Sequence, residues 1–297
     1  TATVGSGTVI VTSDEDGVPF TLSVSGTGLT SSVTTPNEGL PEDLALWQAE
    51  DPSFYLVLED SRLDGNILAL ASAIEALAAP KLFLAQSADA DANTSATDDL
   101  GSQLQDLGYY RTAIVSYNDD AAWLDAALAG ACISRPAGSI SWENRRVVGV
   151  TGMEYATTTQ AMAKRWTVLE RYRAAGISAT RGGRVAQGTP IDLIIARDAI
   201  KSAMQTRGLE YVTSNPKVPY TNDGAAALAN YAVRATLLEF AGAPYNVVDP
   251  TSIDLQIRPR SAQSSTNRGN RHWAGIDWSC TLQGAIGTFD IHGTMTA

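Results

Sequence analysis

The stretch FYLVLED (residues 54–60) decides how the first half of this chain folds. Its apolar side chains follow one another without interruption, which is typical of a strand inside a parallel sheet. The runs KLFLAQS (residues 81–87) and RTAIVSY (residues 111–117) have the same character. Segments with helical spacing separate or follow these runs: Ile67, Leu70, Ile74 and Leu77; Asp98–Leu107; and Ala121–Ala129. Strands that alternate with helices predict an α/β fold, with a parallel sheet covered by helices on both faces.

The pattern changes at SRPAGSISWENRRVVGVTG (residues 134–152), where Pro and Gly interrupt it before one more expected strand. Helices are expected at Thr157–Ala174, where Met162, Trp166 and Leu169 share one face, from Pro190 to a C-terminal cap at Gly208, and from residue 222 to about 238. Alternating segments at 253–257, 276–282 and 286–295 then predict strands. We therefore predict a mixed α+β core domain that ends in antiparallel strands.

These patterns divide the chain into three expected regions. Residues 1–50 form a β-rich hairpin segment, built from Thr8–Val11 and Val18–Val24 and followed by a short helix. Residues 51–140 form the α/β domain, and residues 141–297 form the α+β core domain. Within the core domain, the polar loop PRSAQSSTNRGNRHW (residues 259–273) is long enough to indicate either function or disorder.

Charge is distributed unevenly along the chain, whose net charge is −11. Residues 1–140 hold 20 acidic and 4 basic side chains, whereas residues 141–297 hold 12 acidic and 17 basic ones. This asymmetry indicates two regions with different surroundings, although an ordinary solvated surface explains it equally well. We expect the acidic region to face outward and the weakly basic region to face an acidic partner.

Chemistry-bearing motifs are absent from the sequence. His272 and His292 are the only histidines, and neither belongs to a metal-binding or triad pattern. There is no phosphate-binding glycine loop, and the paired acids Asp98–Asp99 and Asp119–Asp120 stand where helices are expected to begin. We therefore predict no catalytic residue, no metal and no cofactor.

Other partner classes are also disfavoured. Arginine pairs such as Arg181/Arg184 and Arg268/Arg271 lack interleaved aromatic residues in an acidic chain, so nucleic acid is not an expected partner. No apolar run approaches the roughly 18–20 residues that a membrane span requires, so no membrane contact is expected. Cys132 and Cys280 form no motif, and the sequence leaves open whether they are two thiols or one disulfide.

The last stretch, LQGAIGTFDIHGTMTA (residues 282–297), alternates with a period of two. Phe289, Ile291 and Met295 share one parity, which predicts a strand with one buried face. Its unpaired backbone groups are able to template pairing with another chain. The strand either completes the sheet of its own chain or pairs with the sheet of a neighbouring copy.

Four stretches in order give the second half of the chain a family resemblance. PAGSISWENRRVVGVTG (residues 136–152), QGTPID (residues 187–192), VPYTNDGAAAL (residues 218–228) and LQGAIGTFDIHGTM (residues 282–295) resemble tail sheath proteins of contractile-tailed bacteriophages. The resemblance covers about residues 108–297, and such sheath proteins are usually longer at the N-terminus. The chain therefore resembles the C-terminal part of a longer sheath subunit.

The resemblance implies a loosely subtilisin-like α/β domain without protease chemistry and a core domain packed on the tail tube. It implies a virion structural protein, assembled in the bacterial host cytoplasm as a helical homo-oligomer of stacked hexameric rings. Its other partners would be the tail tube, baseplate and neck proteins. Contraction of the sheath would drive the tube into the host cell.

Two sets of candidate contact residues follow from this resemblance. The intersubunit strand would use Ile286, Phe289, Ile291 and Met295 by β-augmentation. The basic residues expected to face the tube are Arg145, Arg146, Lys164, Arg165, Arg171 and Arg173. Two alternatives stay open: a surface-binding, adhesin-like virion module, suggested by the Thr/Ser/Gly-rich first 35 residues, and an α/β hydrolase-like enzyme.

Overall fold

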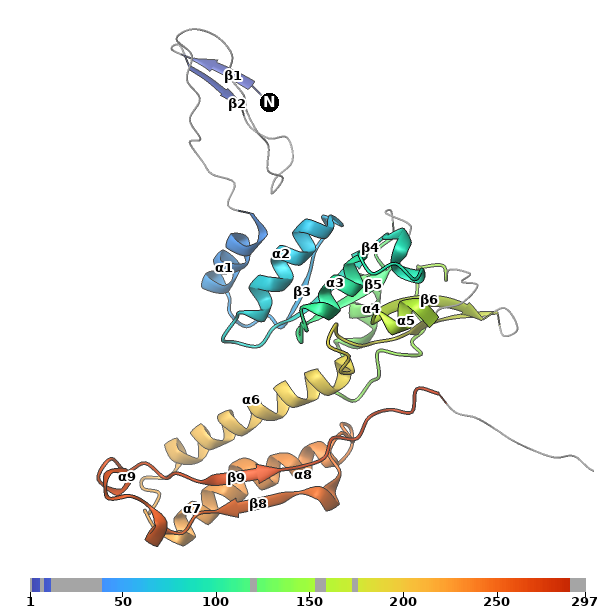
Figure 1. Ribbon diagram of the computed structural model, residues 1–297. Coiled ribbons are helices and arrows are strands. Elements are labelled where there is room, and N and C mark those ends of the chain that lie inside the picture. Colours follow the sequence, from blue (N-terminus) through green and yellow to red (C-terminus); the bar gives the residue numbers. More distant parts are fainter. Residues whose placement is uncertain are drawn as a thin grey trace, which may run out of the picture.

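A five-stranded sheet and a separate helix-and-hairpin unit organise the computed structural model of this chain (Figure 1). The structure describes residues 2–5, 8–11, 39–117, 122–152, 159–172 and 176–288. At the N-terminal end, β1 (Ala2–Gly5) pairs antiparallel with β2 (Thr8–Val11). The expected partner of Thr8–Val11, the segment Val18–Val24, lies outside the described residues.

The central sheet has the order β3-β4-β5-β6-β7, which is also the order of the strands in the sequence. The first four strands are parallel and the last pair is antiparallel. The strands are β3 (Leu56–Leu58), β4 (Leu82–Ser87), β5 (Thr112–Ser116), β6 (Trp166–Tyr172) and β7 (Ile177–Arg181). The first three match the predicted apolar runs, and every residue of β4 and β5 is buried, as expected for inner strands of a covered parallel sheet.

Helices cover both faces of this sheet, so the predicted three-layer α/β fold is confirmed. One core packs α1 (Leu40–Glu50), α2 (Asp64–Glu75), α3 (Leu100–Asp106) and α5 (Thr159–Ala163) on one face. A second core packs α4 (Leu124–Cys132) and the start of α6 (Ile191–Ser214) on the other. A short helix, η1 (Ala90–Asn93), follows β4.

The sheet continues beyond residue 140, where the α/β domain was expected to end. The helix predicted over Thr157–Ala174 is wrong, because among its described residues only Thr159–Ala163 is helical and Trp166 begins β6. Arg165 separates the two elements with a positive φ of 67°. The residues that follow are β-branched or aromatic at several positions, and four of them are buried in a row. The strand that was expected after the Pro and Gly interruption in residues 134–152 does not form within that stretch.

The second unit begins where α6 leaves the sheet (Figure 1). Here α6 packs against η2 (Asn230–Arg234), a π-helical segment, and α8 (Ala235–Ala241), with α7 (Asn222–Ala229) preceding them. A core around Leu237 and Phe240 joins these helices to the antiparallel pair β8 (Asp254–Ile257) and β9 (Ile276–Ser279), with η3 (Pro250–Ser252) before β8. The predicted α+β character and antiparallel pairing are confirmed for this unit.

Helix α6 extends six residues beyond the cap predicted at Gly208. A glycine inside a helix costs roughly 1 kcal/mol relative to alanine. The packing of α6 against η2 and α8 offsets this cost, because Ala203 and Met204 on α6 pack against the core of the second unit. Tertiary packing therefore decides the end of this helix.

Candidate interaction surface

The connection between β8 and β9 folds into an ordered, strongly basic end of the second unit. It contains η4 (Arg260–Ala262) and α9 (Ser265–Gly269). Gln263 is buried beneath it, and its side-chain amide donates a 2.8 Å hydrogen bond to the Ala274 carbonyl and accepts one from the Ala274 N–H at 3.2 Å. The polar loop of residues 259–273, for which the sequence indicated either function or disorder, therefore has a defined structure.

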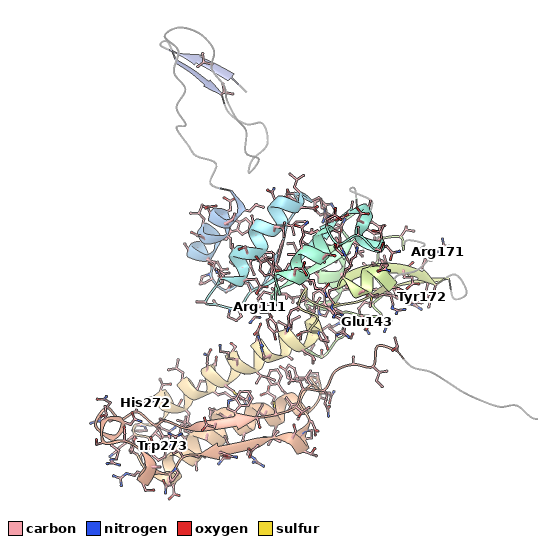
Figure 2. All side chains as sticks on the ribbon, in the orientation of Figure 1. Arg111, Glu143, Arg171, Tyr172, His272 and Trp273 are labelled. Atoms are coloured by element: carbon pink, nitrogen blue, oxygen red, sulfur yellow. The ribbon has the colours of Figure 1, made fainter. Side chains whose placement is uncertain are left out.

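Aromatic side chains attach this connection to the start of α7. The Tyr220 and Trp273 rings lie 4.8 Å apart between centroids, and the Tyr220 hydroxyl donates a 2.9 Å hydrogen bond to the His272 carbonyl. Figure 2 shows His272 and Trp273 at this end of the molecule, far from the central sheet. These contacts hold the loop in one shape relative to the helices.

Four arginines project from the connection, and we call them the basic tip: Arg258, Arg260, Arg268 and Arg271. All four are exposed, and none forms an ion pair within the described part of the chain. Arg260 and Arg268 line a hollow of about 610 Å³ together with Asp223 at the start of α7. Four exposed arginines favour binding to an acidic protein surface, because each guanidinium group can form two parallel hydrogen bonds with a carboxylate.

Sequence reasoning singled out Arg268 and Arg271 but did not include them among the contact residues. The available signal was the density of arginine in a long polar loop. What the sequence could not show is that Arg258 and Arg260, which lie 8 to 13 residues earlier, project from the same end of the paired strands β8 and β9.

The basic residues expected to face a tube do not share one environment. Lys164 is buried, and its ammonium lies 2.8 Å from an Asp99 carboxylate oxygen, so we remove it from that set. Arg165 is half-buried at the turn before β6, and Arg145 is half-buried beside Glu143. Arg146 and Arg171 are exposed, whereas Arg173 lies outside the described residues.

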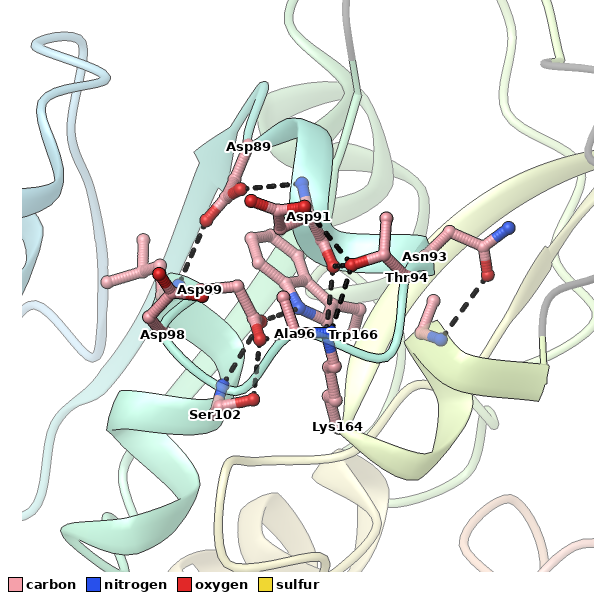
Figure 3. A network of polar contacts seen from close by, with 12 residues as sticks. Asp89, Asp91, Asn93, Thr94, Ala96, Asp98, Asp99, Ser102, Lys164 and Trp166 are labelled. Atoms are coloured by element: carbon pink, nitrogen blue, oxygen red, sulfur yellow. Dashed lines mark hydrogen bonds and ion pairs between the residues drawn. The ribbon is translucent and has the colours of Figure 1, made fainter.

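Asp99 organises the polar network in which Lys164 takes part (Figure 3). It caps the N-terminus of α3, as the sequence predicted for this acid, by accepting a 3.2 Å hydrogen bond from the Ser102 N–H. It also accepts hydrogen bonds from the Ser102 hydroxyl at 2.5 Å and the Trp166 indole at 2.9 Å. Burial by itself would raise the pKa of Asp99, but the hydrogen bonds from Lys164, Ser102 and Trp166 outweigh it and lower the pKa. This network serves to hold α3, α5 and β6 together.

The histidines, cysteines and acidic residues are the side chains that could bind a metal ion or react. No three His, Cys, Asp or Glu side chains there are placed to hold a metal ion. His272 is exposed at the basic tip, and His292 and Asp119–Asp120 lie outside the described residues. Cys132 and Cys280 are both free, and burial raises the pKa of the Cys132 thiol to about 11. None of the helices described has the length and apolar character needed to cross a bilayer.

The C-terminal segment leaves the second unit and returns to the first. The Gln283 N–H donates a 2.8 Å hydrogen bond to the Val247 carbonyl, and further on the Asn144 side-chain amide donates one of 2.9 Å to the Gly287 carbonyl. Ile286 is 84% exposed and belongs to no strand within this single chain. Phe289, Ile291 and Met295 lie outside the described residues, so the intersubunit strand stays a prediction.

Comparison with solved structures finds chains of similar fold. No family model matches the sequence, and no curated protein matches it. A chain in the cryo-EM structure of the anti-feeding prophage (AFP) baseplate, 6-fold symmetrised, is similar with a TM-score of 0.60 and 14% identity, covering 91% of this chain and 84% of that one. A chain of an extracellular contractile injection system, the PVC sheath complex in its contracted state, has a TM-score of 0.46 and 12% identity over 76% of this chain and 68% of that one. The chain therefore shares its fold with a chain of the AFP baseplate structure.

Proposed function

We propose that this chain is a non-enzymatic structural subunit of a contractile tail-like machine. The observation that carries the proposal is the similarity of fold to a chain of the AFP baseplate structure over nine-tenths of the sequence. More specifically, we propose a sheath subunit that polymerises helically around a tail tube and contracts.

The hairpin β8–β9 supports a role in polymerisation. It contains only two strands, and the described residues place no further strand on either of its outer edges. Two-stranded sheets are marginally stable alone, and their free edges are suited to accept another strand. We propose that the segment of residues 286–295, which begins at the exposed Ile286, adds to this sheet in a neighbouring copy.

A head-to-tail connection of this kind joins different surfaces of successive copies. Such heterologous contacts build rings or open helical assemblies, and do not build two-fold dimers. Strand pairing also suits a contracting assembly, because two rigid bodies can change orientation while the backbone hydrogen bonds of the connecting strand persist. We keep the exposed Arg146 and Arg171, together with Arg145, Arg165 and Arg173, as the proposed contacts with an acidic tube.

Electron microscopy of the purified chain tests the proposal. We expect tubes or hexameric rings, either alone or on addition of the tube protein encoded with it. A population that consists of monomers under both conditions would contradict it. The surface-binding alternative rests mainly on residues 1–35, most of which lie outside the described residues, so no observation favours it.

A further inference from the structure

An aromatic and acidic pocket lies at the end of β3, remote from the basic tip. Its volume is about 350 Å³, and α1, β3 and α4 contribute its walls. We define it by Trp47, Leu58, Glu59, Asp60, Trp123 and Asp125. Because β3 is an outer strand of the sheet as described, a partner can approach the pocket without crossing another strand.

Glu59 gives this pocket a polar group without a clear partner. The residue is 7% exposed, and neither of its carboxylate oxygens accepts a hydrogen bond by distance and angle. Burial raises the pKa of Glu59 to about 7, against the smaller opposing effects of the Ser61 hydroxyl and the Arg62 charge. A buried carboxyl group that lacks a hydrogen-bond partner is stabilised when a cation or a hydrogen-bond donor binds to it.

The walls of the pocket already show which cation fits. The Arg62 guanidinium lies 4.1 Å from the Trp123 ring centroid and 3.1 Å from an Asp125 oxygen. Arg62 therefore forms its ion pair with Asp125 and acts on Glu59 only through its charge, so the carboxylates of Glu59 and Asp60 remain available to pair with a second cation. Trp47 and Trp123 are 47% and 44% exposed, so their rings remain open to a second flat guanidinium.

The chain's own N-terminal segment cannot supply that cation. The sequence contains no Lys or Arg before Arg62, and residues 1–38 contain four acids. Within one molecule, the basic tip and the pocket lie on different units, with α6 between them (Figure 1). A second copy offers four exposed arginines that have no ion-pair partner in the described structure.

We infer that this pocket receives an arginine from the basic tip of a second copy of the chain. This inference rests on the proposed function, because it supplies a second head-to-tail contact between polymerising subunits. The arginine stacks between the exposed tryptophans and pairs with Glu59 and Asp60. Arginine suits this environment better than lysine, because its guanidinium is weakly hydrated and stacks on aromatic rings.

A reciprocal charge reversal tests the contact. The pocket variant is Asp60→Lys, at an exposed position, and the tip variant is the double substitution Arg260→Glu and Arg268→Glu. Sedimentation velocity over a range of concentrations measures self-association of the full chain. We expect each variant alone to weaken association at least about tenfold, and an equimolar mixture of the two variants to recover association at low salt, because the tip of each variant then meets a pocket of opposite charge in the other. Combining both reversals in one chain should restore association, because the reversed charges again attract each other.

Matched controls separate this contact from a general charge effect. Asp106→Lys reverses an exposed acid elsewhere in the α/β unit, and Lys201→Glu reverses an exposed base on α6; both should associate like the wild type. Circular dichroism checks that every variant is folded. Failure of the combined variant to recover, or equal losses in the controls, would overturn the inference.

The outcomes also distinguish this inference from the proposed function. Tubes or rings that persist unchanged in both reversal variants would reject the pocket contact and leave polymerisation intact. In a chain that lacks residues 288–297, the pocket contact should still give a weaker, salt-sensitive association that Asp60→Lys abolishes. Loss of all association in that shortened chain would reject the pocket contact as an independent connection.

Discussion

The Trp166 indole N–H donates a 2.9 Å hydrogen bond to the Asp99 carboxylate, which ties the first residue of β6 to the N-terminus of α3. The Lys164 ammonium lies 2.8 Å from the other oxygen of the same carboxylate. Gly101 makes room for this arrangement, because a Cβ at that position would collide with the indole. One buried carboxylate therefore links the start of β6 to α3, in addition to the pairing of β6 with β5.

Replacing Asp99 with Ala should destabilise the α/β unit strongly. The change leaves the Lys164 charge buried without its partner, and breaking a buried pair in this way costs about 3–5 kcal/mol. Urea unfolding followed by Trp fluorescence measures the effect. The matched control is Asp98→Ala, because the neighbouring acid is exposed, and it should cost below about 0.5 kcal/mol. Equal losses for the two variants would show that Asp99 does not organise this region.

The carboxyl group of Glu59 should make stability depend on pH between about 4.5 and 7. Burial raises its folded-state pKa to about 7, with Asp60 raising it further and Ser61 and Arg62 lowering it, so the folded state binds more protons than the unfolded state in this range. Its contribution to stability is therefore present below the unfolded pKa and is lost as pH rises through 7. Glu59→Gln should gain on the order of 1–3 kcal/mol at pH 8 and little at pH 4. The exposed control Glu50→Gln should show no such difference, and a Glu59→Gln gain that is equal at both pH values would refute the assignment.

The joint between the two units depends on Asp198 of α6. Its carboxylate accepts a 2.8 Å hydrogen bond from the Tyr55 hydroxyl and pairs with Arg111, which Figure 2 places at the base of the sheet. Asp198→Ala leaves the half-buried Arg111 unpaired, and we expect faster hydrogen exchange in Ile191–Ser214 together with a loss of about 2–4 kcal/mol. Lys201→Ala, on an exposed face of the same helix, serves as the control. Unchanged exchange in the Asp198 variant would show that packing alone holds the joint.

The sequence predicts the α/β core well because its inner strands are buried on both faces. Continuous apolar runs such as KLFLAQS leave few alternatives when short helices separate them. The same reasoning fails at β6, since Trp166 and Leu169 fit a helical period with Met162, while the burial of these two residues depends on pairing with β5, about 50 residues earlier. A period alone does not separate a helix from a strand when tertiary pairing decides between them.

Contact surfaces are harder to predict than cores for a related reason. Arg258 and Arg268 belong to one surface because β8 and β9 pair and Gln263 closes their connection. Glu59 and Trp123 share a pocket because parallel strands bring their carboxyl ends to one edge of the sheet. Lys164 was expected at a surface, and its burial follows from Asp99, which lies 65 positions earlier. Charge counts along the sequence contain no information about such pairings.

The central claim is that this chain polymerises through the strand of residues 286–295. Deleting Thr288–Ala297 separates an intersubunit strand from one that completes the chain's own fold. Loss of a core strand would remove the burial of Phe289 and Ile291, at about 1.5–3 kcal/mol for each side chain, from a typical domain stability of about 5–15 kcal/mol. A matched pair of point variants refines the result: Ile291→Asn should impair assembly, whereas Asp290→Asn, on the opposite parity, should not.

The decisive measurement is electron microscopy of the chain shortened at residue 287, with circular dichroism and thermal melting on the same sample. We predict a folded chain with near-native secondary structure and melting temperature that forms no tubes or rings. A folded, shortened chain that still forms them would contradict the claim.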